Sequence, residues 1–440
     1  MDILLIFTIL VYIAILYCRR DWAYPSVLFV GVWAFILLLY TFQIFKILSP
    51  TSEIIAVLAV MIVAFPLGSA TFSLVSFERV PRKPRPTTVL SADQRQIRGI
   101  LFFVLCAISA VVMLVDQFQI IHSVLAGASF SDVMRASEGK GTVEISGPVR
   151  VTLYMFIVHP ITASVSPICA VEVLTRKSER LRYLIANIII VFLAVFHHGG
   201  RNAIIVMGIS YLVAYAVLKS SRIAVSRKAK VSFFVFGVLG IIAVFSLSSS
   251  RGIQDIWLSF YAYFIADIPL GQQYLQASHL IIGHTWGFLS FQGFFYPLYS
   301  VLGFFGISPS HLYEMSTVMS DYVEANYLPI GNYSVTGSNA FLPAGAYPYV
   351  DGGYIFEFIF MFAYGYVSAY LYKRQRFGGT KDKALYVFWA YALVLSFCRL
   401  YFTSYSYFVG MLLIVFIFYK GSGAPRVHPG RELSLEKKVS

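Results

Sequence analysis

Long apolar stretches recur along the whole chain and are separated by shorter polar gaps. Each stretch is roughly 20 residues long, which is the length that an α-helix needs to cross a bilayer. The pattern predicts an all-α, polytopic helical membrane protein. It places eleven transmembrane helices at residues 2–18, 24–44, 54–76, 99–118, 150–174, 183–198, 202–218, 231–248, 352–372, 384–399 and 403–419.

Composition supports a membrane protein and argues against a soluble one. Hydrophobic residues make up 58% of the 440 residues and charged residues only 12%, and the mean hydropathy is +0.74. A typical soluble domain has about 25% charged residues. The formal net charge of +13 does not indicate a nucleic-acid partner, because the basic residues lie between the apolar stretches and not in one patch.

The basic residues are distributed unequally between alternate gaps. One set of gaps, together with the carboxyl-terminal tail, contains 27 of the 34 Lys and Arg residues, and the other set contains 7. Cytoplasmic loops are enriched in Lys and Arg. We therefore expect the amino terminus outside the cytoplasm and the tail, residues 421–440, inside it.

The longest gap, residues 251–351, lies outside by the same rule and forms a large outer loop within a single membrane domain, residues 1–440. Two of its stretches, 256–270 and 285–306, are apolar enough to enter the bilayer. If both crossed, the link between them would be cytoplasmic, yet it contains neither Lys nor Arg. We therefore expect one or two interfacial or re-entrant helices here in addition to the eleven spans.

Three of the few outer arginines lie next to the predicted ends of apolar helices. They are Arg201 in "FHHGGRNAI", Arg251 in "SLSSSRGIQD" and Arg399 in "SFCRLYFTS". A cation close to the apolar zone is costly unless it is paired or faces a wet cavity. One explanation is that the three side chains extend separately to lipid headgroups. The alternative, which we favour, is that they bind one anionic ligand.

The chemistry expected for this site is transfer from a diphosphate without a metal or another cofactor. The chain has no paired-acid motif for a divalent cation, no HExxH and no glycine-rich phosphate loop. Arginine forks bind phosphate oxygens and stabilise a diphosphate leaving group. A base is also needed to deprotonate an attacking hydroxyl. The candidates are His284, His311, Glu324 and Asp351, of which we select His284 and Asp351.

Glu357 lies within the predicted span 352–372, where a carboxylate needs a partner. An outer arginine is an available partner.

Most of the chain resembles Wzy-type O-antigen or oligosaccharide repeat-unit polymerases, which are related to O-antigen ligases. The resemblance rests on the number of spans, the outer amino terminus, the large outer loop and three stretches, "HHGGRNAIIVMGISYL", "SSSRG" and "AYPYVDGGYIFEFIFMFAYGYVSAYLY". It implies that outer arginines bind a lipid diphosphate, with Arg201 and Arg251 matching best and Arg399 less well. It also implies a histidine in the outer loop, for which His284 and His311 are both candidates.

The resemblance further implies a multi-pass protein of the bacterial inner membrane that makes surface polysaccharide, such as the O-antigen of lipopolysaccharide. Its substrates would be undecaprenyl-diphosphate-linked oligosaccharides, and its partners membrane lipids, a chain-length regulator and a flippase. Two alternatives remain open. A ligase would use the same kind of site, whereas a flippase of lipid-linked oligosaccharides would have internal repeats and charges along a central cavity.

Overall fold

The computed structural model describes residues 1–76, 97–127, 152–176, 179–198, 202–221, 256–325, 328–331 and 341–419. Within these ranges the regular structure is helical, with no β-strand and two isolated bridges, Ile47 with Gly331 and Ile97 with Tyr419. The expected all-α class is therefore confirmed for the described residues.

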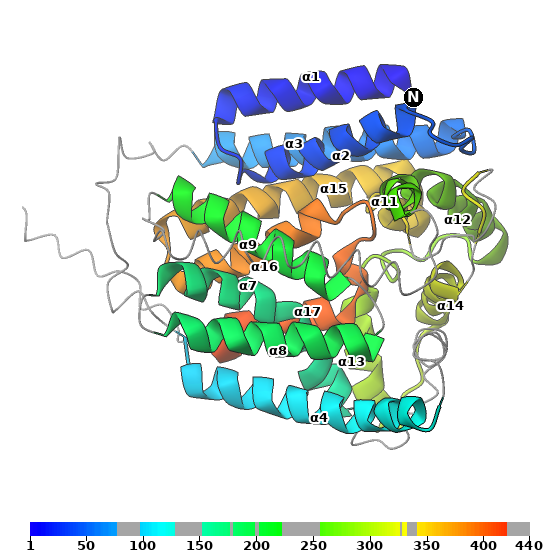
Figure 1. Cartoon of the computed structure of the whole chain (residues 1–440). Helices are drawn as coiled ribbons and strands as arrows, with labels where there is room; N and C mark the ends of the chain where they lie inside the picture. The colour runs from blue at the N-terminus through cyan, green and yellow to red at the C-terminus, as the bar shows by residue number, and fades with distance from the viewer. Residues whose placement is uncertain are drawn as a thin grey trace, which may run out of the picture.

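The first three helices lie together at one edge of the bundle (Figure 1). They are α1 (Asp2–Arg19), α2 (Pro25–Thr41) and α3 (Ser52–Val75). Local signals set their ends. Helix α1 stops where Arg20 adopts a left-handed backbone with φ 49°, and α2 begins at Pro25, where a missing N–H costs nothing. The Thr51 side chain caps α3 by accepting a hydrogen bond from the backbone N–H of Ile54 at 3.5 Å.

The described residues in the middle of the chain form four further helical elements. These are α4 (Gly99–Leu125), a π-helical turn η2 (Tyr154–Val158) that continues into α7 (His159–Thr175), α8 (Arg180–His198) and α9 (Asn202–Ser220). A π-helical turn adds one residue to the ordinary helical repeat and is common next to functional sites. The beginning of α7 is therefore a candidate location for a functional site.

The described residues of the outer segment form four short helices, α11 (Ile256–Ile265), α12 (Asp267–Ile281), α13 (Gln292–Gly303) and α14 (His311–Ala325). Of these, α11, α12 and α14 gather at one end of the bundle (Figure 1). With 10 to 15 residues each, they are shorter than the roughly 20 residues that a full crossing requires. Their lengths fit the expected interfacial or re-entrant arrangement.

The last part of the chain contains α15 (Ala346–Phe377), α16 (Thr380–Val394), a 3-10 turn η3 (Tyr401–Thr403), α17 (Tyr405–Leu412) and a π-helical end η4 (Leu413–Phe418). Helix α15 is kinked at Gly352 and Gly353, and Gly353 has a φ of 72° that favours glycine. Helix α7 is the central element, since it packs against α8, α9, α16 and α17.

The most extensive contact between described helices joins α3 to α15, which also lie side by side in Figure 1. Two glycines make the close approach possible. A Cβ on Gly68 would lie 1.9 Å from the carbonyl oxygen of Phe362, and a Cβ on Gly365 would lie 2.0 Å from that of Phe65. Small residues at a crossing let two membrane helices come together without a side chain between them.

Among the described residues, six helices or helix pairs are long and apolar enough to cross a membrane, which supports a membrane-embedded protein. They are α1, α3, α4, η2–α7, α9 and α15, and two shorter apolar helices, α2 and α17–η4, accompany them. The predicted span 231–248 lies outside the described residues. The total of eleven spans therefore stays a prediction, as do the outer amino terminus and the cytoplasmic tail. We call the outer end of the bundle the end that the positive-inside rule places away from the cytoplasm.

Candidate functional site

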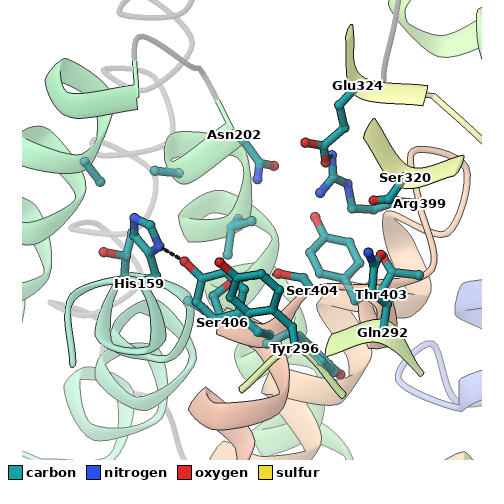
Figure 2. Close-up of a pocket in the computed structure, with 18 of the residues that line it drawn as sticks. His159, Asn202, Gln292, Tyr296, Ser320, Glu324, Arg399, Thr403, Ser404 and Ser406 are labelled. Carbon is teal, nitrogen blue, oxygen red and sulfur yellow. Dashed lines mark hydrogen bonds and ion pairs between the residues drawn. The ribbon is translucent and has the colours of Figure 1, made fainter. Parts of the chain in front are cut away.

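A polar cavity of about 560 Å³ lies at the outer end of the bundle. The beginnings of α7, α9 and α17 and the last turns of α8 and α16 form its membrane side, and α13 and α14 cover it. Figure 2 shows labelled side chains of α7, α9, α13, α14 and α17 around one space. Hydroxyl, amide, imidazole, carboxylate and guanidinium groups meet there, so the cavity suits a polar ligand.

Arg399 is the one Lys or Arg among the described residues that line this cavity. It follows α16, and its Nη2 lies 3.4 Å from Oε1 of Glu324 on α14. The Arg399 side chain is 32% exposed and that of Glu324 is 57% exposed. The pair is partly open to solvent, which screens its attraction. A bound anion can therefore compete with Glu324 for the guanidinium.

A histidine and a tyrosine form a second polar pair on the opposite side of the cavity. Nδ1 of His159, the first residue of α7, is hydrogen-bonded to the hydroxyl of Tyr405 on α17 (Figure 2). The Tyr405 ring is stacked on Tyr296 of α13, with centroids 5.0 Å apart and planes inclined by 21°. The pair thus combines a proton-transfer group with a flat aromatic surface.

Helix α14 brings two carboxylates to the cavity, Asp321 and Glu324. They are three residues apart, so they project from the same face of the helix. Burial, and after it the nearby charge of Glu324, raises the pKa of Asp321 above its ordinary value. Two neighbouring carboxyl groups with unequal proton affinity are a common arrangement for general acid–base chemistry.

The structure brings only part of the predicted site into this cavity. Arg399 lines it, and so does Glu324, which we weighed as a base. Arg201 and Arg251 lie outside the described residues, so their roles stay predictions; in the sequence, Arg201 directly precedes Asn202, a residue of the cavity wall. His311 is the exposed first residue of α14 and does not line the cavity.

His284 and Asp351, the two predicted catalytic residues, lie together but away from the cavity wall. His284 is exposed, and its Nδ1 is 3.2 Å from the carbonyl oxygen of Val350. Its catalytic role is untested by this arrangement and stays a prediction.

Asp351 is fully buried, and its carboxylate holds the turn before α13. Oδ1 accepts hydrogen bonds from the Thr285 hydroxyl and from the backbone N–H of Leu289 at 3.1 Å, and Oδ2 accepts one from that of Ser290 at 2.8 Å. The backbone carbonyl of Asp351 also accepts a hydrogen bond from Trp286 at 2.9 Å. These contacts give Asp351 a structural role, whatever further role it has.

Glu357 is fully buried in α15, next to Gly345. Among the described residues, neither of its carboxylate oxygens has a hydrogen-bond partner, and no described arginine pairs with it. The arginine partner expected from the sequence is thus not found in the described part of the chain.

Three residues of the cavity wall, His159, Tyr296 and Tyr405, were not predicted from the sequence. His159 lies inside the predicted span 150–174, where an ionisable residue is a functional candidate in its own right. The following Pro160 is a second local signal, because it reinforces the break at the π-helical turn. The two tyrosines gave no signal, since an apolar stretch rich in aromatic residues does not show which rings will stack.

Comparison of the chain with protein-family models, with curated proteins and with solved structures finds no match.

Proposed function

We propose that this protein polymerises undecaprenyl-diphosphate-linked oligosaccharide repeat units into surface polysaccharide at the outer face of the bacterial inner membrane. The observation that supports this most is the outer cavity, where the Arg399 guanidinium, the α14 carboxylates and the His159–Tyr405 pair surround one polar space. A lipid diphosphate lies at headgroup level with its sugar just outside the apolar zone. A site at the outer ends of membrane helices is therefore at the right depth for it.

In the proposed reaction, one lipid-linked unit attacks another. The hydroxyl oxygen of the acceptor sugar forms a bond to the anomeric carbon of the donor glycan, and the bond from that carbon to the diphosphate oxygen breaks. Undecaprenyl diphosphate leaves with the bonding electron pair, and a base takes the hydroxyl proton. Each step needs either stabilisation of a growing negative charge or removal of a proton.

Arg399 fits the first task, because a guanidinium stays charged and binds phosphate oxygens in a fork. Its loose contact with Glu324 leaves it available to the leaving group. The sequence supplies two further candidates for the same role, Arg201 and Arg251.

The second task has several candidates. Asp321, Glu324 and His159 line the cavity and can accept a proton there. The bases selected from the sequence, His284 and Asp351, would need a substrate that reaches beyond the cavity wall. The stacked rings of Tyr296 and Tyr405 are suited to packing against the C–H face of a sugar.

The test is a deletion strain complemented with wild-type protein, Arg399→Ala or Arg376→Ala, with membrane expression matched and glycan length displayed on a gel. Arg376 is an exposed arginine near the carboxyl end of α15 and does not line the cavity, so it serves as the control. We expect Arg399→Ala to shorten the glycan towards single repeat units and Arg376→Ala to leave it unchanged. Normal chain length with Arg399→Ala would refute a role for the cavity in polymerisation.

The same strain separates the two alternative functions. Without a polymerase, single lipid-linked units accumulate at the outer face. Without a ligase, long lipid-linked chains form but are not transferred to the final acceptor. Without a flippase, the units stay on the cytoplasmic face. Extracting the lipid-linked material from the deletion strain, and testing its accessibility from the periplasm, therefore decides between the three.

A further inference from the structure

A second hollow lies at the opposite end of the bundle, where α3 and α15 finish. It has a volume of about 770 Å³ and is open on one side. Its apolar wall comes from Phe72 and Val75 of α3 and from Tyr370 and Phe377 of α15, and its cations are Lys373 and Arg374. We call this hollow the inner notch. The positive-inside rule assigns this end to the cytoplasm, because Lys373, Arg374 and Arg376 begin a basic gap.

Arg374 is held in a fixed orientation within the inner notch. Its Nε donates to Oδ1 of Asp382 at 2.6 Å, and its Nη1 lies 3.5 Å from the Tyr370 hydroxyl. Asp382 is only 8% exposed, whereas the Arg374 side chain is 41% exposed. The carboxylate therefore fixes one edge of the guanidinium and leaves the terminal nitrogen Nη2 without a partner among the described residues.

The apolar part of the inner notch is exposed as well. Val75 is 69% exposed, Phe377 is 51% exposed and Tyr370 is 45% exposed. The notch thus combines an apolar groove along two membrane helices with two cations at its cytoplasmic mouth. Basic pockets between membrane helices on the cytoplasmic side bind anionic lipid headgroups. A free anion would use the cations but leave the apolar groove empty.

We propose that the inner notch binds one anionic phospholipid of the cytoplasmic leaflet. Its phosphate contacts Lys373 and the open edge of Arg374, and an acyl chain lies along Val75 and Phe377. The bound lipid joins the ends of α3 and α15, and so supports the helix pair that forms the most extensive contact between described helices. This proposal is independent of the proposed function.

The test is native mass spectrometry of the full-length protein in detergent, titrated with phosphatidylglycerol or phosphatidylcholine. The notch variant carries Lys373→Gln and Arg374→Gln. The control variant carries Arg376→Gln and Lys381→Gln, which remove the same charge at the same end outside the notch. Each basic residue near an anionic headgroup contributes about fivefold in affinity, so the notch variant is expected to bind phosphatidylglycerol about 25-fold more weakly. The control variant is expected to match the wild type.

Two further measurements keep the test decisive. Because Arg374→Gln removes the ionic partner of Asp382, Lys373→Gln alone is tested as well, with an expected loss of about fivefold. Inorganic phosphate is added as a competitor and is expected to displace little lipid. Equal loss in the control variant, equal binding of phosphatidylcholine, or complete displacement by phosphate would each overturn the proposal.

Discussion

Gly293 controls how closely α13 approaches the turn between η3 and α17, and its replacement by alanine tests the geometry of the outer cavity. A Cβ at this position would lie 2.5 Å from the carbonyl carbon and oxygen of Ser404 and 2.6 Å from the carbonyl oxygen of Phe402. Ordinary contacts of a Cβ begin at 3.4 Å. The obstructing atoms belong to the backbone and cannot rotate away. Helix α13 or the turn must therefore move by about 0.9 Å.

This movement shifts one wall of the cavity relative to the other. Gln292 and Tyr296 line the cavity from α13, and the ring of Tyr296 is stacked on Tyr405. Displacing a positioning group by about 1 Å can lower a rate about 100-fold. Overpacking at such a contact costs about 1 to 3 kcal/mol of stability. We expect Gly293→Ala to lower polymerisation by about 10- to 100-fold while the protein still folds.

The assay is polymerisation of lipid-linked repeat units in membranes, normalised to the amount of protein that elutes as a single species after solubilisation. Gly303→Ala is the matched control, because Gly303 ends the same helix and a Cβ there meets nothing within 4 Å. That control should be neutral or slightly stabilising, since alanine is the better helix former. Wild-type activity in Gly293→Ala, or an equal loss in Gly303→Ala, would refute the reasoning.

Four further outcomes are expected. Arg399→Lys should reduce polymerisation at least tenfold although the charge is kept, because an ammonium group cannot reproduce the fork, while Arg376→Lys should have no effect. Asp351→Asn should lower stability by about 1 to 3 kcal/mol in thermal unfolding, because an amide cannot accept all three hydrogen bonds. Burial raises the pKa of Asp267 well above its ordinary range, so the folded state retains a proton that the unfolded state loses. This contribution to stability is complete below the unfolded pKa and is lost as the pH rises through the folded pKa, so the gain in unfolding temperature from Asp267→Asn should grow as the pH rises above the ordinary range of an aspartic acid. Polymerisation should also survive a metal chelator.

Each of these outcomes can fail independently. Full activity in Arg399→Lys would show that this position needs a positive charge but not the guanidinium fork. An unchanged unfolding temperature in Asp351→Asn would mean that the carboxylate does not support the turn. A constant difference between Asp267→Asn and the wild type across the pH range would show that Asp267 does not keep its proton on folding. Loss of polymerisation with chelator, with rescue by magnesium, would overturn a mechanism based on arginine alone.

The helices could be predicted from the sequence because apolar stretches of about 20 residues have few other stable forms in a bilayer. The position of Arg399 beside a polar site could be predicted as well, because outer cations are so few that each one needs an explanation, whereas its role stays a prediction. Which helices pack against each other could not be predicted. Helices α3 and α15 are apolar on nearly every side, so no hydrophobic stripe indicated that Gly68 and Gly365 would face each other.

The functions of single polar residues were harder to predict, for a related reason. The position of Asp351 beside two glycines was compatible with a cap or with a base. Only the folded outer segment reveals that its oxygens are used by residues more than 60 positions earlier in the chain. Asp351 was noticed but its role was ambiguous, whereas His159 was not noticed. One imidazole hardly changes the hydropathy of a long apolar stretch.

The crossing of α3 and α15 also determines how late in synthesis the helix bundle can assemble. Helix α3 ends at Val75 and α15 begins at Ala346, so most of the chain must be made and inserted before the two can meet. Until then the face of α3 that carries Gly68 lacks its partner. A ribosome that stalls before α15 would leave an amino-terminal group of helices without its main contact. Such truncated chains should be recognised by membrane proteases, whereas chains that have passed Phe377 should become resistant.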